Sequence, residues 1–200
     1  MKTGVIAGFL FVILLHPAGN GLAQSLDEAA LVNLLREGGL VLVMRHASSP
    51  RQAPTADTAN PDNINIERQL DEAGRRDAMT MGESIRRLGI PITEVDSSPA
   101  YRTLETARLA GFVDVRIRDY LGNQGMVNAS EAFKDRLLAD LEAAPPGGNR
   151  LLITHSPNIA AAFPELDPET EQGEVLVIDP RISVTVPVTR IAIGVWPGLP

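Results

Sequence analysis

The stretch Leu40-Val41-Leu42-Val43-Met44-Arg45-His46-Ala47 places the strongest constraint on how this chain can fold. Five apolar residues in succession, two of them β-branched valines, predict a central parallel strand that is covered on both faces. Open α/β folds place their ligand crevices at the carboxyl ends of such strands, so Arg45 and His46 are expected at the mouth of a site. A permanent cation beside a ring nitrogen that can be neutral at physiological pH suits attack on a phosphorus atom surrounded by negative oxygens. The alternative is a polar strand end that faces water.

The same pattern occurs a second time near the end of the chain. Residues 150–154, with the sequence RLLIT, form another apolar run that continues directly into His155. Between the two histidines, a short strand over 92–96 leads into a Ser-Ser-Pro break, and Arg102 follows at the start of a helix, where backbone N–H groups without partners favour an anion. Two histidines that both sit at strand ends are hard to explain as coincidence, and Arg102 is the second candidate for holding a phosphate.

The remaining patterns predict an α/β chain with a mostly parallel sheet flanked by helices. A helix is expected from a Ser25 cap to Gly38, another over 67–88, one that starts near Thr103, and one over 130–141. Strands are expected over 113–117 and, as an edge pair, over 173–178 and 189–195. The polar stretch 47–65 has no apolar period and is predicted to be a functional loop. This loop and residues 122–127 are expected to select the substrate.

The first residues are predicted to be a targeting sequence and not part of the folded domain. Lys2, an apolar run over 5–15 and the small residues of Gly21-Leu22-Ala23 are typical of a secretory signal peptide. We therefore expect a signal peptide over 1–23, a single domain over 24–200, and a mature protein that is periplasmic or secreted. An uncleaved anchor is the alternative, although the apolar run is short for a membrane span.

Composition excludes several classes of function. The formal net charge of −7 argues against nucleic acid as a partner, because such binding requires a basic surface. The chain has no cysteine, which excludes disulfides and thiolate chemistry. No P-loop, dinucleotide-binding or close-spaced metal-ligand motif is present, so neither a cofactor nor a metal is expected.

Three segments together resemble a known group of enzymes. The sequences VMRHA, SSPAYRTLETA and ITHSPNI, with an RQLDEAGRRDA helix after the first, are similar to the histidine phosphatase superfamily, the phosphoglycerate mutase-like group. The resemblance covers nearly all of 24–200 and implies a three-layer α/β sandwich. By position, His46 resembles the nucleophile that becomes a phosphohistidine, while Arg45, Arg102 and His155 resemble the pocket for the phosphoryl group. The glycine that usually follows the Arg-His pair is Ala47 here, which departs from the pattern.

The proton donor to the leaving group has two candidates. Asp119, after the third strand, resembles the acid of the mutase branch by position, and Glu174 begins the strand after His155. Either carboxylate could instead be a solvated charge, and for Asp119 the expected partner is then Arg118. Without an acid the enzyme would be limited to good leaving groups, because an alkoxide leaves poorly without a proton. Asn158 is expected to touch the substrate or to cap the following helix.

The sequence therefore predicts an exported phosphomonoester hydrolase that acts on a small phosphorylated substrate through His46 and without a metal. A second hypothesis is a binding module of the same fold that captures a phosphorylated ligand without turnover. A mutase is a weaker third, since phosphoglycerate isomerisation belongs to the cytosol and this chain has the features of export. The sequence leaves the substrate and the oligomeric state open.

Overall fold

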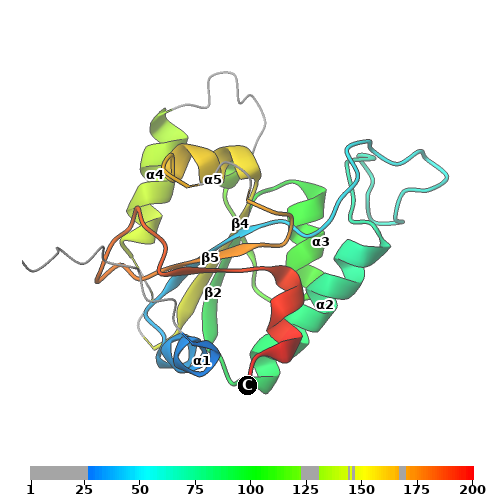
Figure 1. Ribbon diagram of the computed structural model, residues 1–200. Coiled ribbons are helices and arrows are strands. Elements are labelled where there is room, and N and C mark those ends of the chain that lie inside the picture. Colours follow the sequence, from blue (N-terminus) through cyan, green and yellow to red (C-terminus); the bar gives the residue numbers. More distant parts are fainter. Residues whose placement is uncertain (1–26, 123–130, 144, 146, 167–169) are drawn as a thin grey trace, which may run out of the picture.

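The protein is built around one six-stranded sheet with the order β3-β2-β4-β1-β5-β6 (Figure 1). The computed structural model describes residues 27–122, 131–143, 145, 147–166 and 170–200. The strands β3, β2, β4 and β1 run parallel, whereas β5 is antiparallel to β1 and β6 is antiparallel to β5. The predicted α/β fold with a mostly parallel sheet is confirmed. The strands are β1 (Val41–Arg45), β2 (Ile92–Ser97), β3 (Arg116–Ile117), β4 (Asn149–Thr154), β5 (Val175–Ile178) and β6 (Thr189–Ile191).

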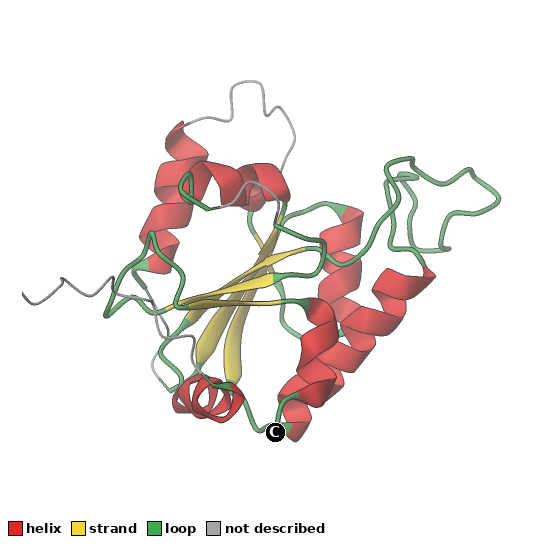
Figure 2. Ribbon diagram, in the orientation of Figure 1, coloured by secondary structure: helices red, strands yellow, loops and turns green. Residues whose placement is uncertain are grey.

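Helices cover both faces of this sheet and complete three layers (Figure 2). The helices are α1 (Glu28–Glu37), α2 (Glu72–Arg87), α3 (Tyr101–Leu109), α4 (Glu131–Leu141) and α5 (Ser156–Ala162), with the 3-10 helices η1 (Asp119–Leu121) and η2 (Ile193–Gly198). Apolar residues of α1, α2, α3 and η2 form one core with the sheet, and those of η1, α4 and α5 form the other.

The strand β1 shows why its sequence is an unbroken apolar run. Leu42 and Met44 point into the first core, and Val41 and Val43 point into the second. All four side chains are buried. Because alternate residues of a strand face opposite sides, only a strand covered on both faces needs apolar residues at every position. Each such side chain stabilises the fold by about 1.5–3 kcal/mol.

Two predicted helices begin later than expected, each at an aspartate. The cap of α1 is Asp27, whose carboxylate accepts from the Ala30 N–H at 2.7 Å, and the predicted cap Ser25 lies outside the described residues. The helix predicted over 67–88 begins at Glu72, because the Asp71 carboxylate accepts from the Gly74 N–H at 2.7 Å. In both caps the aspartate itself has an extended backbone, so the helix cannot begin before it.

Two predicted strands are shorter than expected. The strand predicted over 113–117 is reduced to Arg116–Ile117. Asp114 has a left-handed φ of 55°, which is incompatible with a strand, so the strand can only begin after it. The edge strand predicted over 189–195 stops at Ile191, after which η2 buries Trp196 in the first core. The predicted antiparallel edge pair is otherwise confirmed by the pairing of β5 with β6.

The segment between β1 and α2 contains no helix or strand, as expected, and projects from the body of the molecule (Figure 1). Its beginning lies against the start of α2, where a Cβ added to Gly74 would be 2.2 Å from the Ser48 carbonyl oxygen. Its return is held by Glu105, whose carboxylate accepts from the Asn60 amide at 2.9 Å and from the Leu70 N–H at 2.7 Å. Polar contacts therefore give this projecting loop (residues 47–71) a defined course.

The predicted signal peptide over 1–23 lies outside the described residues, as do the predicted selectivity residues 123–127. Within the part of the chain that the structure describes, none of the helices combines the length and the apolarity needed to cross a membrane.

Candidate active site

The sheet brings the two histidines together. β1 and β4 are neighbouring parallel strands whose register pairs Arg45 with Thr154, so His46 and His155 follow at the same carboxyl edge. The His46 N–H donates to the Thr154 carbonyl at 3.1 Å, which continues the ladder by one residue. The two rings meet edge to face with their centroids 5.4 Å apart, and both side chains are buried.

Hydrogen-bond partners fix which nitrogen of each ring carries a hydrogen. Nδ1 of His46 lies 2.8 Å from the Ala47 carbonyl oxygen, which can only accept, so Nδ1 is protonated and Nε2 keeps its lone pair. Nδ1 of His155 lies 3.0 Å from Nη2 of Arg102, which can only donate. Nε2 of His155 therefore carries the hydrogen and donates to Oγ of Ser98 at 2.9 Å.

Both imidazoles are neutral at physiological pH. Burial and the charges of Arg102, Arg45 and Arg68 together lower the pKa of His46 to about 3, against the opposing hydrogen bond to Ala47. Burial likewise lowers the pKa of His155 to about 2, together with the charges of Arg102, Arg68 and Arg45 and the His46 ring. A neutral ring with a free lone pair is the form that attacks an electrophile.

Arg102 approaches the histidines from the first turn of α3 and is almost fully buried, at 6% exposure. Its Nε has no hydrogen-bond partner among the described residues, and no carboxylate of the described chain forms an ion pair with it. Burial and the charge of Arg68 lower its pKa to about 10 against the opposing charge of Glu67, so Arg102 stays protonated at neutral pH. A buried guanidinium without a carboxylate favours an incoming anion.

Arg45, the last residue of β1, is half-buried beside the same rings. Its Nη1 donates to the Thr170 carbonyl, and its charge contributes to the lowered pKa of both histidines. The structure therefore brings together all four residues that the sequence placed around the phosphoryl group, His46, His155, Arg45 and Arg102.

Two further residues at this site were missed from the sequence. Arg68 was placed inside the helix predicted over 67–88, but it lies in the projecting loop before α2. There its Nε donates to the Pro50 carbonyl at 2.6 Å and its Nη2 to the Ser49 carbonyl at 3.0 Å. Ser98 was noted only as a strand break, yet it contacts His155 directly. Only the position of Ser98 after a strand could have indicated its role.

Ala47, which replaces the usual glycine, is fully buried with Leu70 and Ala78. Its N–H donates to Oγ1 of Thr106 at 3.2 Å, and its carbonyl accepts from His46. Both backbone groups of Ala47 are therefore used within the protein, where they orient the His46 ring.

Neither candidate acid contacts a histidine. The Glu174 carboxylate lies 2.6 Å from Nε and 2.8 Å from Nη2 of Arg190 and accepts from the Glu171 N–H at 2.9 Å. Although burial opposes ionisation, these bonds hold the pKa of Glu174 below its usual value, which makes it a poor acid. Asp119 is exposed at the start of η1, and its expected partner Arg118 instead pairs with Asp96 at 2.9 Å.

Asn158 occupies a structural position. Its Nδ2 lies 2.8 Å from the Leu121 carbonyl, 3.0 Å from the Gly122 carbonyl and 2.8 Å from Oγ1 of Thr154. These bonds tie η1 to the end of β4. The expected cap is wrong, because the N-cap of α5 is His155 and no side chain bonds to the first turn. The expected contact with substrate stays a prediction, and within the described structure the amide nitrogen of Asn158 is used for these bonds.

Within the described ranges, no group of three histidine, aspartate or glutamate side chains is arranged to hold a metal ion.

Comparison with known proteins gives a match at the level of structure. No family model matches the sequence, and no curated protein matches it. A protein assigned as the phosphohistidine phosphatase SixA of Agrobacterium tumefaciens shares 20% identity at a TM-score of 0.53, over 78% of this chain and 99% of that one. The protein histidine phosphatase SixA complexed with tungstate shares 16% identity at a TM-score of 0.52, over 78% of this chain and 97% of that one.

The chain has the histidine phosphatase fold. At these identities the likeness establishes the architecture, and it confirms the phosphoglycerate mutase-like three-layer sandwich expected from the sequence. In the histidine phosphatase fold of this chain, the carboxyl ends of β1 and β4 hold His46 and His155, which is the geometry described above.

Proposed function

We propose that this chain is a phosphomonoesterase of the histidine phosphatase superfamily, in which His46 carries the phosphoryl group as a phosphohistidine intermediate. The observation that carries the proposal is the arrangement of His46: a buried neutral ring, oriented by the Ala47 carbonyl, with its Nε2 lone pair free. Beside it lies Arg102, a cation without a carboxylate. The SixA proteins support this reading, since one is a phosphohistidine phosphatase by name and the other binds tungstate, an oxyanion.

The proposed reaction has two steps. Nε2 of His46 attacks the phosphorus atom, the bond between phosphorus and the ester oxygen breaks, and the leaving group departs with the bonding electron pair and takes a proton from solvent. Water then attacks the phosphohistidine and gives up a proton to solvent, the P–N bond breaks with its electron pair returning to Nε2, and inorganic phosphate is released with His46 restored. Charge on the equatorial oxygens is balanced by Arg45 and Arg102, and arginine suits this role because its donor fork matches two oxygens at once.

The source of the proton for the leaving group shapes which substrates react. Glu174 is ionised and bonded to Arg190, and Asp119 makes no hydrogen bond to either histidine in the described structure. We therefore propose that the enzyme prefers leaving groups that depart without strong acid assistance, such as phenolates. Asp119, which is exposed on η1, remains the candidate acid for poorer leaving groups.

The test is the replacement His46→Asn, because an asparagine amide can still donate to the Ala47 carbonyl. With a generic aryl phosphate as substrate, we expect the rate to fall by more than roughly 10³-fold. An acid-labile phosphoprotein should be trapped from the parent protein and not from the variant. Arg76→Met, on the solvent side of α2, is the control for general effects of substitution. Unchanged phosphatase activity in His46→Asn would rule the proposal out.

A second function, capture of a phosphorylated ligand without turnover, is favoured by one observation. No carboxylate contacts His46 or His155 among the described residues, so a bound ester could lack its proton donor. The two functions differ in pre-steady-state kinetics. A burst of phosphate release together with a trapped phosphohistidine excludes the binding module, whereas stoichiometric binding without release excludes the enzyme.

We further propose that the mature protein is exported and works in a periplasm or outside the cell without a metal. The support for export is the pattern of residues 1–23. Sequencing the amino terminus of the protein recovered from the outer compartment tests export, and a start after Ala23 is expected. Activity that survives a strong chelator is the expected result for metal independence.

A further inference from the structure

Two arginines that the proposed reaction does not use lie near the paired histidines, and we call Arg51 and Arg68 the outer arginine pair. Arg68 is held by the carbonyl oxygens of Ser49 and Pro50, which follow His46 closely in the chain. That backbone is itself fixed, because Gln172 donates to the Ser49 carbonyl at 3.1 Å. The position of Arg68 next to the histidines is therefore set by several independent contacts.

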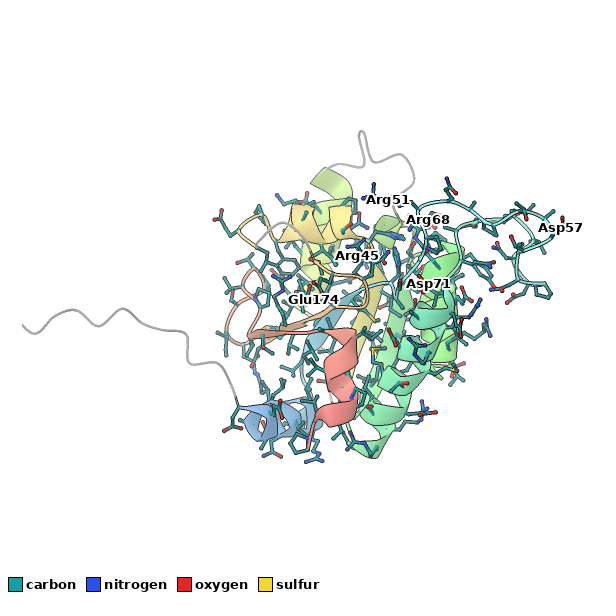
Figure 3. All side chains as sticks on the ribbon, turned by 45° about the vertical axis from the view of Figure 1, so that its right-hand side comes forward. Arg45, Arg51, Asp57, Arg68, Asp71 and Glu174 are labelled. Carbon is teal, nitrogen blue, oxygen red and sulfur yellow. The ribbon has the colours of Figure 1, made fainter. Side chains whose placement is uncertain are left out.

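The outer arginine pair has no acidic partner. Neither arginine forms an ion pair with any carboxylate of the described chain, and Arg51 makes no hydrogen bond there either. In Arg68, Nε and Nη2 are used, and no acceptor among the described residues is bonded to Nη1. Figure 3 shows Arg51 and Arg68 at the base of the projecting loop near Arg45, whereas Asp57 lies at its far end.

The charges of these arginines reach the pocket. The charge of Arg68 helps to lower the pKa of His46, His155 and Arg102. Burial lowers the pKa of Arg68 itself, and the charge of Arg51 lowers it further. Uncompensated positive charge is therefore concentrated at one edge of a protein whose formal net charge is −7.

This charge exceeds what a phosphoryl group requires. Because His46 and His155 are neutral, Arg45 and Arg102 supply two positive charges, which match a phosphomonoester dianion. The outer arginine pair adds two more on the rim. Glu67 offsets part of the total positive charge, since its charge acts on Arg102 and its carboxylate accepts from the Tyr101 N–H at 3.1 Å. A positive charge remains for a second anionic group.

We propose that the outer arginine pair binds a second anion of the substrate, a carboxylate or a phosphate carried by the leaving group close to the scissile phosphoryl. The proposal rests on the proposed function for the position of that phosphoryl group and adds the class of substrate. Arg68 supplies its Nη1 hydrogens from a fixed position, and the exposed Arg51 folds over the second anion. Paired donor forks of this kind favour planar carboxylates and phosphates over neutral groups.

The experiment measures binding, so that it does not depend on turnover. Calorimetry compares 3-phosphonopropionate with propylphosphonate, which share a phosphonate and differ in the second anion, and propane-1,3-bisphosphonate distinguishes a phosphate-like group from a carboxylate. We expect the parent protein to bind the first about tenfold more tightly than the second. The preference should fall to about threefold in Arg51→Met and to about unity in Arg68→Met, and it should weaken as salt is raised. Arg76→Met, which removes an exposed charge from α2, should keep it.

The outcomes separate this proposal from the proposed function. Equal affinity for 3-phosphonopropionate and propylphosphonate in the parent protein overturns the second anion site, even if phosphatase activity is present. A preference that survives in both Arg51→Met and Arg68→Met overturns it as well. Arg51→Met carries the decision if Arg68→Met fails to fold, because Arg51 makes no hydrogen bond in the described structure. A preference without any turnover supports the site and contradicts the enzyme, and no binding of either phosphonate overturns both.

Discussion

Two groups of arginines in this molecule differ in what surrounds them. Around Asp96, which is fully buried on β2, Nε of Arg116, Arg118 and Arg150 lie 2.8, 2.9 and 2.8 Å from its carboxylate oxygens. Around the histidines, Arg102 and the outer arginine pair have no carboxylate partner in the described chain. The comparison shows that arginine alone does not indicate a function. A guanidinium balanced by a carboxylate holds the scaffold, and one left unbalanced at a strand end is available to a ligand.

The largest loss of stability is expected when Asp96, the carboxylate at the centre of the balanced arginine group, is removed. Asp96→Ala leaves the buried guanidinium of Arg150 with only part of its compensation, from Asp140 at 3.3 Å and Glu94 at 3.6 Å. Removing one partner of a buried ion pair costs about 3–5 kcal/mol. Urea denaturation should show this loss of stability, while the folded fraction keeps its kcat. A normal midpoint in Asp96→Ala would contradict the structural role of this cluster.

In the unbalanced group, replacing an arginine is expected to lower the rate and to leave stability intact. Arg102→Met removes a buried charge that forms no ion pair in the described chain and has only the more distant Glu67 carboxylate to offset it, so the free energy of unfolding should stay the same or rise. The rate should fall by roughly 10²–10³, because a donor to the transferring phosphoryl group is lost. Steady-state kinetics and denaturation on the same preparation measure both quantities. If Arg102→Met destabilises the fold as strongly as Asp96→Ala does, the distinction between the groups fails.

The two groups also differ in how their contribution to stability depends on pH. In the unfolded chain His46 and His155 bind a proton below about pH 6.5, whereas in the folded protein their pKa values are about 3 and about 2. Stability contributed by the neutral rings is therefore complete above pH 6.5 and decreases as the pH falls, by at most about 1.4 kcal/mol per pH unit for each ring. Arginines hold the pKa of Asp96 below 3.8 against the effect of burial, so its contribution is lost only at lower pH.

Denaturation at pH 7, 6 and 5 measures this dependence. The parent protein should lose stability over that range, and a His46→Asn and His155→Asn double variant should show a flatter profile. An equal slope in both proteins would mean that the two rings titrate normally in the folded state.

The sheet and the convergence of four side chains could be predicted because they depend on short patterns. An apolar run such as Val41–Met44 is buried on both faces wherever it occurs, and parallel neighbours end at the same edge. This information was sufficient to place His46 beside His155 without coordinates. The predicted helix starts were wrong by a few residues. For α2, the apolar spacing continues before Asp71 and suggests an earlier start, but Asp71 caps the helix and fixes its first residue as Glu72.

The contribution of the projecting loop could not be predicted in the same way. Arg68 reaches the site through bonds to the carbonyl oxygens of Ser49 and Pro50, and backbone acceptors carry no sequence signature. The ionisation of Glu174 depends on Arg190, which arrives on a different strand. Side chains that act through tertiary partners need the fold before their roles can be assigned.

The adjacency of β1 and β4 in the sheet also determines when the site can exist. β1 is made early in synthesis, but the strand that supplies its partner histidine follows only after most of the chain. Contacts between such distant segments form late in folding, because a long loop must close before they are made. A growing or truncated chain that ends before Asn149 would thus carry His46 but not His155, and the proposed hydrolysis could begin only once nearly the whole protein has been completed.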